Sequence, residues 1–556
     1  MEQLTEMDYS FVQMESNRTP LHITPVMFYD QSTAPGGKVR FRDILRVFER
    51  NLHKSAVFRR KLSDHTFGLD TPYWVEDGDF DLEFHVRHIA LPQPGDWRQL
   101  CILMARLHAR PLDMRRPLWE AYVIEGLNGV EHLPPNCFAI LLKVHHAAID
   151  GVSAAEILNA IHSLTDEPVP PLVEDDWQPE PEPPALQVWS RAYLNTIRRP
   201  VRLVETVGRL VPKMIRASRE SEDTGKSADS FRTVFNDRVS SFRVMDAIIL
   251  DLDEVKGIRQ AVAGVTVNDV IVSVVGGGLR KYLQGKGELP QGSLVTAAPI
   301  NVRAERNSDS RGNQVGIMSI RMYTDIEDPV ERLRAVNESV RGSKEYASAV
   351  GTTSMMELSQ GLWPQVIGAG FKLGTLFARA GDIGLPMHTV VSNVPGPQVP
   401  LYLAGARLHM LVGLGPIMDM MGLFHGVISG AGKISITFVS CRELMPDPQT
   451  YRECLQEAWD ELRAATHTLA PVKRSKRRAG GRGSGARAGK VARPKAKANA
   501  KLGPETKSKT KSKSKSKSKS KAGVGPKTKA KNKTKNKTKA RAAAGRKAAA
   551  KKRPAN

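Results

Sequence analysis

The chain has few cysteines: four among 556 residues, at positions 101, 137, 441 and 454. They form no CxxC pair and show no spacing typical of a zinc site, so the sequence predicts neither a disulfide framework nor a metal centre. The N-terminal stretch MEQLTEMDYSFVQMES lacks the basic and apolar regions of a secretory signal. We therefore expect a protein of the reducing cytoplasm.

The sequence also lacks a long uninterrupted apolar run. Residues 410–432 come nearest, but they contain six glycines together with Pro416, Asp419 and His425. A membrane-spanning helix needs about 20 predominantly apolar residues. We therefore expect buried strands and turns here, and any membrane contact is predicted to be peripheral.

Acidic residues are nearly absent from the C-terminal tail. Residues 471–556 hold 33 of the 82 Lys and Arg but one acid, Glu505, whereas residues 1–470 hold 49 basic and 57 acidic side chains. The tail has no aromatic residue and contains repeats such as KSKSKSKSK, so we expect it to be disordered. Its predicted partners are anionic lipid or nucleic acid, bound through charge alone, and a purely solubilising role is the alternative.

Composition divides the chain into four regions. Residues 1–165 and 240–470 have the mixed pattern of α/β domains, and residues 166–239 form a Pro- and acid-rich linker followed by basic crossover helices. The tail, 471–556, is the fourth region. The basic crossover either bridges the two domains in solvent or docks on anionic lipid. Two domains of similar size favour a site between them.

Apolar periodicity gives the main elements of these domains. The predicted strands are HITPVMFYD, CFAILLKV, AIILDL, LVTAAPINVR and KISITFVSC, and the predicted helices include FRDILRVFERNL, WRQLCILMARLHAR and DPQTYRECLQEAWDELRAATHTL.

The stretch KVHHAAIDGVSAAE places His145, His146, Asp150 and Gly151 where a buried strand turns into a helix. Neighbouring residues of a strand point to opposite faces, so only one of the two histidines can face a given cleft. A histidine titrates near neutral pH and can accept a proton from a hydroxyl, amine or thiol. The alternative is a pair of satisfied surface histidines beside a turn shaped by Asp150 and Gly151.

Capping patterns predict where two helices begin. Ser153 with Glu156 has the spacing of a capping box after the histidine pair, and Thr266 with Asp269 has the same spacing further on. No GxSxG nucleophile motif is present. The segment SGAGKIS (429–435) only resembles a phosphate-binding loop, because Ile434 stands where that loop needs Ser or Thr after its lysine and the glycine spacing is wrong. Direct transfer assisted by a general base is therefore the simplest mechanism.

The HHxxxDG motif resembles the signature of the CoA-dependent acyltransferase superfamily. Five further segments resemble, in order and spacing, the bacterial wax ester synthase/acyl-CoA:diacylglycerol acyltransferase family, and together the match covers about residues 1–468. These segments are MDYSFVQMESNRTPLHI, RPLWEAYVIEGL, TVNDVIVSVVGGGLRKYL, PINVRAERNSDSRGNQVG and VSNVPGP.

This resemblance implies two chloramphenicol-acetyltransferase-like domains of mixed α/β fold, with an active-site channel between them. It implies acyl-CoA as a co-substrate and no cofactor or metal. By motif position, His146 is the general base that takes the proton of the acceptor hydroxyl. His145 and Asp150 are supporting residues, Gly151 belongs to the turn, and Arg303 is a possible partner for Asp150.

Three more residues carry two interpretations each. Asn268 follows Thr266 at a helix start, so it belongs either to the site or to the helix cap. Ser392 and Asn393 precede a Pro-Gly-Pro turn, where they either donate to the thioester oxyanion or shape the turn.

The resemblance therefore implies transfer of a fatty acyl group from acyl-CoA to diacylglycerol, to a long-chain alcohol, or to both. The alternatives are a condensation-type enzyme that uses carrier-bound substrates, and an inactive scaffold that binds lipid surfaces or nucleic acid. The expected location is the cytoplasm, with peripheral attachment to the inner membrane or to lipid inclusions.

Overall fold

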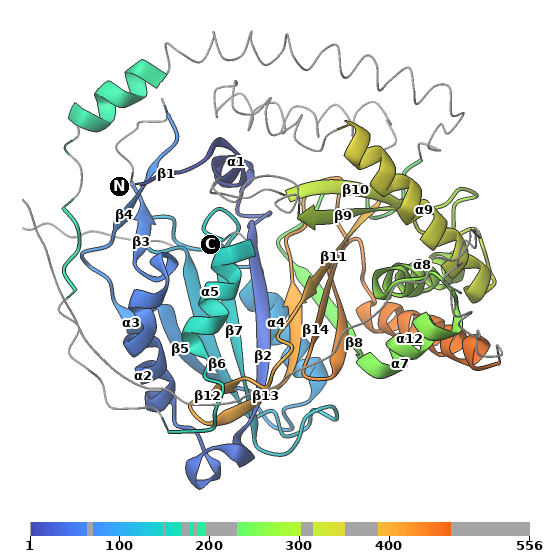
Figure 1. Ribbon diagram of the computed structural model, residues 1–556, viewed down its shortest axis with the longest axis horizontal. Coiled ribbons are helices and arrows are strands. Elements are labelled where there is room, and N and C mark those ends of the chain that lie inside the picture. The colour runs from blue at the N-terminus through green and yellow to red at the C-terminus, as the bar shows by residue number, and fades with distance from the viewer. Residues whose placement is uncertain are drawn as a thin grey trace, which may run out of the picture. The chain divides into compact units, whose positions relative to one another are not determined.

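The computed structural model describes residues that all belong to one unit of the chain, Met1–Lys476 (Figure 1). A second unit, Arg477–Asn556, and the predicted tail from residue 471 lie outside the described residues. The described residues are 2–63, 70–149, 151–168, 177–181, 184, 186–195, 231–301, 315–350 and 387–468.

The first large sheet has six strands in the order β12-β13-β2-β7-β6-β5. All its neighbours pair antiparallel except β5 and β6, which are parallel. Two of its strands, β12 and β13, come from late in the chain, so the C-terminal half completes the N-terminal sheet. The strands are β2 (His22–Asp30), β5 (Val86–Ala90), β6 (Trp119–Glu125), β7 (Cys137–His145), β12 (Tyr402–Leu403) and β13 (Ala406–Leu414).

The second large sheet has the order β10-β9-β11-β14-β15-β8. Its strand β11 runs parallel to both β9 and β14, and the other pairs are antiparallel. The strands are β8 (Arg243–Asp251), β9 (Val295–Asn301), β10 (Val315–Arg321), β11 (Thr389–Pro395), β14 (Phe424–Gly430) and β15 (Lys433–Cys441). A small third sheet joins β1 (Glu2–Gln3), β4 (Tyr73–Glu76) and β3 (Arg60–Leu62).

Helices cover the outer faces of both large sheets (Figure 1). Helices α2, α3 and α5 lie against the first sheet, and α7, α8, α9 and α12 pack together beside the second, while α4 contacts β8. The helices are α1 (Glu6–Met14), α2 (Phe41–Asn51), α3 (Leu82–His85), α4 (Trp97–His108), α5 (Gly151–Ile161), α7 (Leu252–Ala261), α8 (Val267–Gly285), α9 (Pro329–Val350) and α12 (Pro448–His467). A further helix covers residues 186–195.

Strand β7 lies between two hydrophobic cores, and all its residues are buried. Leu141 belongs to the core shared with the second sheet, whereas Leu142 belongs to the core under α2 and α5. A strand with protein on both faces is expected to be apolar throughout, which explains the run CFAILLKV. The one strand thus anchors the histidine pair to both layers.

Most sequence-predicted elements are confirmed. HITPVMFYD is β2, KISITFVSC is β15, and the predicted helices correspond to α2, α4 and α12. Residues 410–432 form the end of β13, β14 and their turns, as expected. In the described part of the chain, no helix combines the length and apolarity needed to cross a bilayer.

The start predicted for the helix after the histidine pair is wrong. Helix α5 begins at Gly151, so Ser153 lies inside its first turn and not at the predicted N-cap position, and Gly151 is helical instead of belonging to the preceding turn. The reason lies just upstream: residues 146–148 already form a turn, closed by the bond from Ala148 N to His145 O (2.9 Å). The chain has therefore reversed before it reaches Gly151.

Candidate active site

The histidine pair sits where β7 ends. His145 is the last residue of β7 and lies opposite His22 of β2. Its backbone N–H donates to Leu118 O (3.0 Å), and that of His146 donates to Leu21 O (2.9 Å). The backbone of both histidines is therefore held by neighbouring chain segments on either side.

His145 is fully buried, and both of its ring nitrogens are engaged. Nδ1 accepts the backbone N–H of Ala147 (3.0 Å), and Nε2 lies 2.5 Å from Oε2 of Glu15. Because Nδ1 accepts, the proton of the neutral ring is on Nε2, where it is donated to the Glu15 carboxylate. His145 is thus locked in one tautomer and cannot also serve a substrate.

His146 is the first residue of the turn after β7, with its ring stacked on Phe11 of α1 at a centroid distance of 4.2 Å. It is partly accessible, unlike His145. Burial lowers the pKa of His146 to about 4. The ring is therefore neutral at pH 7 and able to accept a proton.

Sequence reasoning missed Glu15. It caps the C-terminus of α1 and is separated from His145 by 130 positions, so no local spacing links the two. The available signal was its place in MDYSFVQMES, one of the segments that carry the family resemblance.

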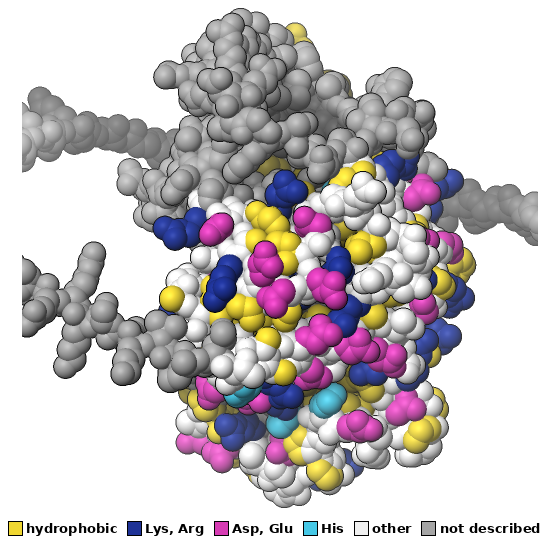
Figure 2. Space-filling view, turned by 90° about the vertical axis from the view of Figure 1, so that its right-hand side faces the viewer, with side chains coloured by type: hydrophobic (Ala, Val, Ile, Leu, Met, Phe, Trp, Pro, Cys, Tyr) yellow, Lys and Arg dark blue, Asp and Glu magenta, His cyan; other side chains and the backbone are white. Residues whose placement is uncertain are grey.

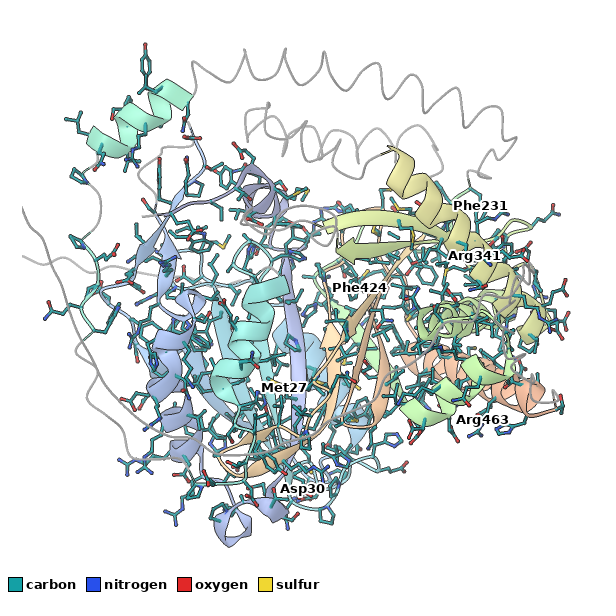
Figure 3. The ribbon with its side chains drawn as sticks, in the orientation of Figure 1. Met27, Asp30, Phe231, Arg341, Phe424 and Arg463 are labelled. Atoms are coloured by element: carbon teal, nitrogen blue, oxygen red, sulfur yellow. The ribbon has the colours of Figure 1, made fainter. Side chains whose placement is uncertain are left out.

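A layer of buried polar groups continues from His145 through the first sheet. His22 Nε2 bonds His108 O (2.8 Å), and His108 bonds Thr24 Oγ1 (2.8 Å) and Gly415 O (3.0 Å). Burial holds the pKa of His22 well below its usual value and lowers that of His108 to about 3, so both stay neutral. Gly415 in turn packs against the ring of Phe424. Phe424, labelled in Figure 3, is the first residue of β14.

Two residues predicted from the second half meet in the structure. The amide of Asn393 donates to Oδ1 of Asn268 (3.4 Å), which brings the end of β11 to the start of α8. Thr266 and Asp269 form the predicted capping box at this helix start, with Thr266 N donating to Asp269 Oδ2 (2.7 Å). Asn268 is therefore free of the capping role and faces Asn393.

The remaining predicted residues are less defined. Ser392 lies on β11 beside Gly426 and is partly accessible. Asp150 and Arg303 lie outside the described residues, so their predicted pairing is untested. Within the described residues, no hydrogen bond joins His146 to Asn268 or Asn393, and no group of His, Cys, Asp and Glu is arranged to hold a metal.

Two family models match this chain in order. The wax ester synthase/diacylglycerol acyltransferase catalytic domain matches residues 4–271, which include both histidines, and the C-terminal domain of the same family matches residues 311–463. The chain belongs to the wax ester synthase/diacylglycerol acyltransferase family.

Curated relatives agree with this family. A Mycobacterium tuberculosis (strain CDC 1551 / Oshkosh) protein named as a candidate diacylglycerol O-acyltransferase is 33% identical over 482 residues, 84% of this chain and 93% of the relative. The "Probable diacylglycerol O-acyltransferase tgs2" of M. tuberculosis (strain ATCC 25618 / H37Rv) is 31% identical over 462 residues, 82% of this chain and 98% of the relative.

Solved structures confirm the mixed α/β fold and the two-domain architecture. A wax ester synthase/diacylglycerol acyltransferase from Marinobacter aquaeolei VT8 matches with a TM-score of 0.59 and 25% identity, covering 84% of this chain and 100% of that chain. The trichothecene 15-O-acetyltransferase TRI3 from Fusarium sporotrichioides has a TM-score of 0.54 at 11% identity, covering 83% and 94%, and shares the fold.

Proposed function

We propose that this member of the family transfers a fatty acyl group from acyl-CoA to the hydroxyl of diacylglycerol, of a long-chain alcohol, or of both. The observation that carries the proposal is the division of labour between the histidines. His145 is locked between Glu15 and the Ala147 amide, whereas the neutral, partly accessible His146 can take a proton.

In the proposed reaction, a ring nitrogen of His146 accepts the proton of the acceptor hydroxyl. The acceptor oxygen then bonds to the thioester carbonyl carbon, whose oxygen becomes an oxyanion. When this intermediate collapses, the C–S bond breaks, and the departing CoA sulfur takes the proton back from His146. The products are the ester and free CoA, and the enzyme returns to its starting state.

The oxyanion needs hydrogen-bond donors from the second half of the fold. Asn393 of β11 is hydrogen-bonded to Asn268 of α8, and Ser392 precedes Asn393 on β11. We assign the oxyanion role to this group, in which each lost donor is expected to lower kcat by about 100-fold or more. Unchanged kcat in Asn393→Ala and Ser392→Ala would leave these residues with a turn-shaping role alone.

The test of the general base is the release of free CoA thiol from a long-chain acyl-CoA with diacylglycerol or hexadecanol. His146→Ala is expected to lower the rate about 10²- to 10⁴-fold, whereas His53→Ala, which removes an exposed histidine, is expected to retain it. Normal CoA release by His146→Ala would contradict the assignment. Transfer from acyl carrier protein but never from CoA would favour a condensation-type enzyme.

A direct competition between two acceptors identifies the one that this enzyme prefers. One labelled acyl-CoA offered with equal amounts of diacylglycerol and hexadecanol shows, from the labelled products, which ester this chain makes. The curated relatives carry diacylglycerol O-acyltransferase names, so we expect triacylglycerol to dominate.

We propose that the helix 186–195 attaches the enzyme to an anionic lipid surface, where such acceptors reside. Four large apolar side chains are exposed on it, while Val188 and Ala192 are buried on its other side. The exposed residues are Leu186 (82%), Trp189 (47%), Tyr193 (62%) and Leu194 (51%). Aromatic and basic residues on one amphipathic helix are typical of the bilayer interface, and Arg191 adds positive charge.

The face formed by the helices beside the second sheet is rich in charge. Figure 2 shows acidic and basic side chains interspersed over the helices beside the second sheet. Several are paired, including Lys281 with Glu461 (2.6 Å) and Arg463 with Glu254 (3.2 Å). Interspersed charges of both signs favour contact with water, so we assign lipid contact to the helix 186–195.

Vesicle flotation tests this attachment. The double variant Leu186→Ser/Tyr193→Ser is expected to lose binding to phosphatidylglycerol vesicles, and Val399→Ser, which removes an exposed apolar residue elsewhere, is expected to bind normally. Equal binding by the wild type and both variants would contradict the proposal.

The Lys-rich tail remains a separately predicted binder of polyanions. The salt dependence of DNA binding by proteins with and without residues 471–556 tests this prediction.

A further inference from the structure

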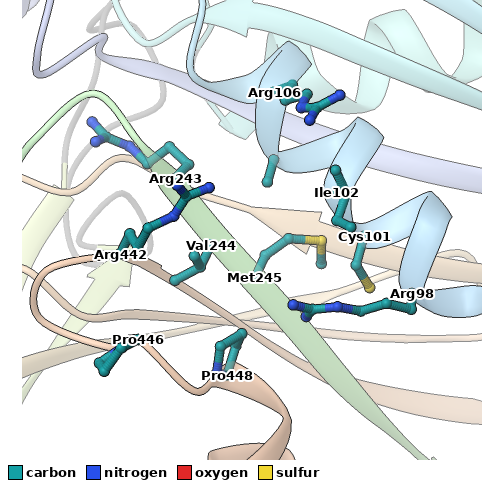
Figure 4. Close-up of a pocket in the computed structure, with 11 residues that line it drawn as sticks. Arg98, Cys101, Ile102, Arg106, Arg243, Val244, Met245, Arg442, Pro446 and Pro448 are labelled. Carbon is teal, nitrogen blue, oxygen red and sulfur yellow. The ribbon is translucent and has the colours of Figure 1, made fainter.

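A pocket of about 180 Å³ lies between α4, the start of β8 and the turn before α12 (Figure 4). Four of its lining residues are arginines: Arg98 and Arg106 of α4, Arg243 of β8, and Arg442, which follows β15. The other lining side chains are apolar, apart from the thiol of Cys101, and none is acidic. Three elements far apart in the sequence thus place four arginines around one pocket.

Arg243 is the buried member of this group, with 7% of its surface exposed. Its guanidinium donates to the backbone carbonyls of Arg18 (2.6 Å) and Ser240, and it forms no ion pair with any carboxylate of the described residues. Burial lowers the pKa of Arg243 to about 10, so the group stays charged at pH 7. A buried charge without a counter-charge is costly, and an anion seated beside it removes that cost.

Two carboxylates act on the pocket arginines: Asp246 on Arg98, and Glu443 on Arg243 and Arg442. Asp246 accepts from the indole of Trp97 (2.7 Å) and lies 3.7 Å from Arg452. Glu443 accepts from the hydroxyl of Ser240. Four arginines outnumber these two carboxylates, so the pocket keeps a net positive charge within apolar walls that strengthen its field.

We propose that this arginine pocket binds the phosphate groups of a phosphate-bearing ligand. Guanidinium groups recognise phosphate through paired N–H donors, and the exposed Arg98, Arg106 and Arg442 line the pocket together with the buried Arg243. The ligand is either acyl-CoA, bound through its phosphates, or a phospholipid headgroup. The first source rests on the proposed function.

The pocket is connected to the candidate site through α4. This helix ends at His108, on whose pKa the charge of Arg243 acts. The His108 ring lies edge-on to His22 at 4.8 Å, and His22 lies opposite His145 in the sheet. A ligand held by the arginines would therefore lie at one end of the polar layer that leads to the histidine pair.

Binding measurements on the full chain test the proposal without requiring turnover. The double variant Arg106→Glu/Arg442→Glu changes exposed residues, so its fold should persist. Arg243→Lys keeps the buried positive charge but removes the paired N–H donors of the guanidinium group. Arg259→Glu, an exposed change on α7, is the matched control. The probes are CoA, pantetheine, which has no 3′-phospho-ADP, and vesicles with and without phosphatidylglycerol.

The two sources give different results. If acyl-CoA is the ligand, both pocket variants bind CoA about tenfold or more weakly than the control, pantetheine binding does not change, and KM for acyl-CoA rises while kcat is retained. If a phospholipid is the ligand, CoA binding is unchanged and phosphatidylglycerol binding falls. Control-like binding of CoA and of both vesicle types by both variants would overturn the proposal, whereas arginine-dependent CoA binding in a chain without transferase activity would overturn only the proposed function.

Discussion

The contact between Glu15 and His145 gives the sharpest test of the site. A hydrogen bond to a charged group contributes about 1.5–3 kcal/mol, and a neutral one about 0.5–1.5 kcal/mol. Glu15→Gln retains a neutral acceptor, so it should cost about 1 kcal/mol. Glu15→Ala leaves the buried Nε2–H of His145 without an acceptor, at about 2–3 kcal/mol.

If the lost hydrogen-bond energy appears as a higher activation barrier, because His146 is no longer held in position, kcat drops roughly fivefold in Glu15→Gln and roughly 30- to 150-fold in Glu15→Ala. KM for acyl-CoA should change little, because Glu15 contacts His145 and not the proposed base. The assay is steady-state CoA release, with urea unfolding on the same proteins and Glu49→Gln on the exposed face of α2 as control. Wild-type kcat in Glu15→Ala would refute the positioning role, and loss of stability without loss of kcat would make the contact structural only.

The remaining predictions concern the buried polar layer. Burial lowers the pKa of His22 and His108 in this layer, and also that of His425, a buried residue of β14 in the second sheet, so the fold keeps these rings neutral while the unfolded chain protonates below pH 6.5. Stability should be full above pH 6.5 and fall by about 2 kcal/mol per histidine by pH 5, and urea midpoints that do not change between pH 8 and 5 would contradict this. A methyl group in Gly415→Ala would overlap the ring of Phe424 and displace the carbonyl that holds His108, so we expect a loss of about 1–3 kcal/mol in the same assay, and wild-type stability would show that the ring can move aside.

Secondary structure could be predicted from the sequence in segments where a single pattern of apolar residues dominates. The apolar run of β7 and the helical periodicity of α12 are local signals, and both elements formed as predicted. The start of α5 did not follow, because the bond from Ala148 N to His145 O reverses the chain before the capping pattern begins. The pairing of β13 with β2 was not predictable from the sequence, because strands separated by about 380 residues share no local pattern that identifies them as partners.

The same reasoning explains which parts of the site were predictable. Strand alternation indicated that the two histidines serve different sides, and the structure places one against Glu15 and the other against Phe11. Alternation is a property of neighbouring residues, so it separates the two histidines but does not predict which of them a carboxylate distant in the sequence will hydrogen-bond. That choice depends on where α1 lies. The Glu15 variants therefore test what the motif alone leaves open: if Glu15 positions His145, its loss must lower turnover through a residue that the motif does not contain.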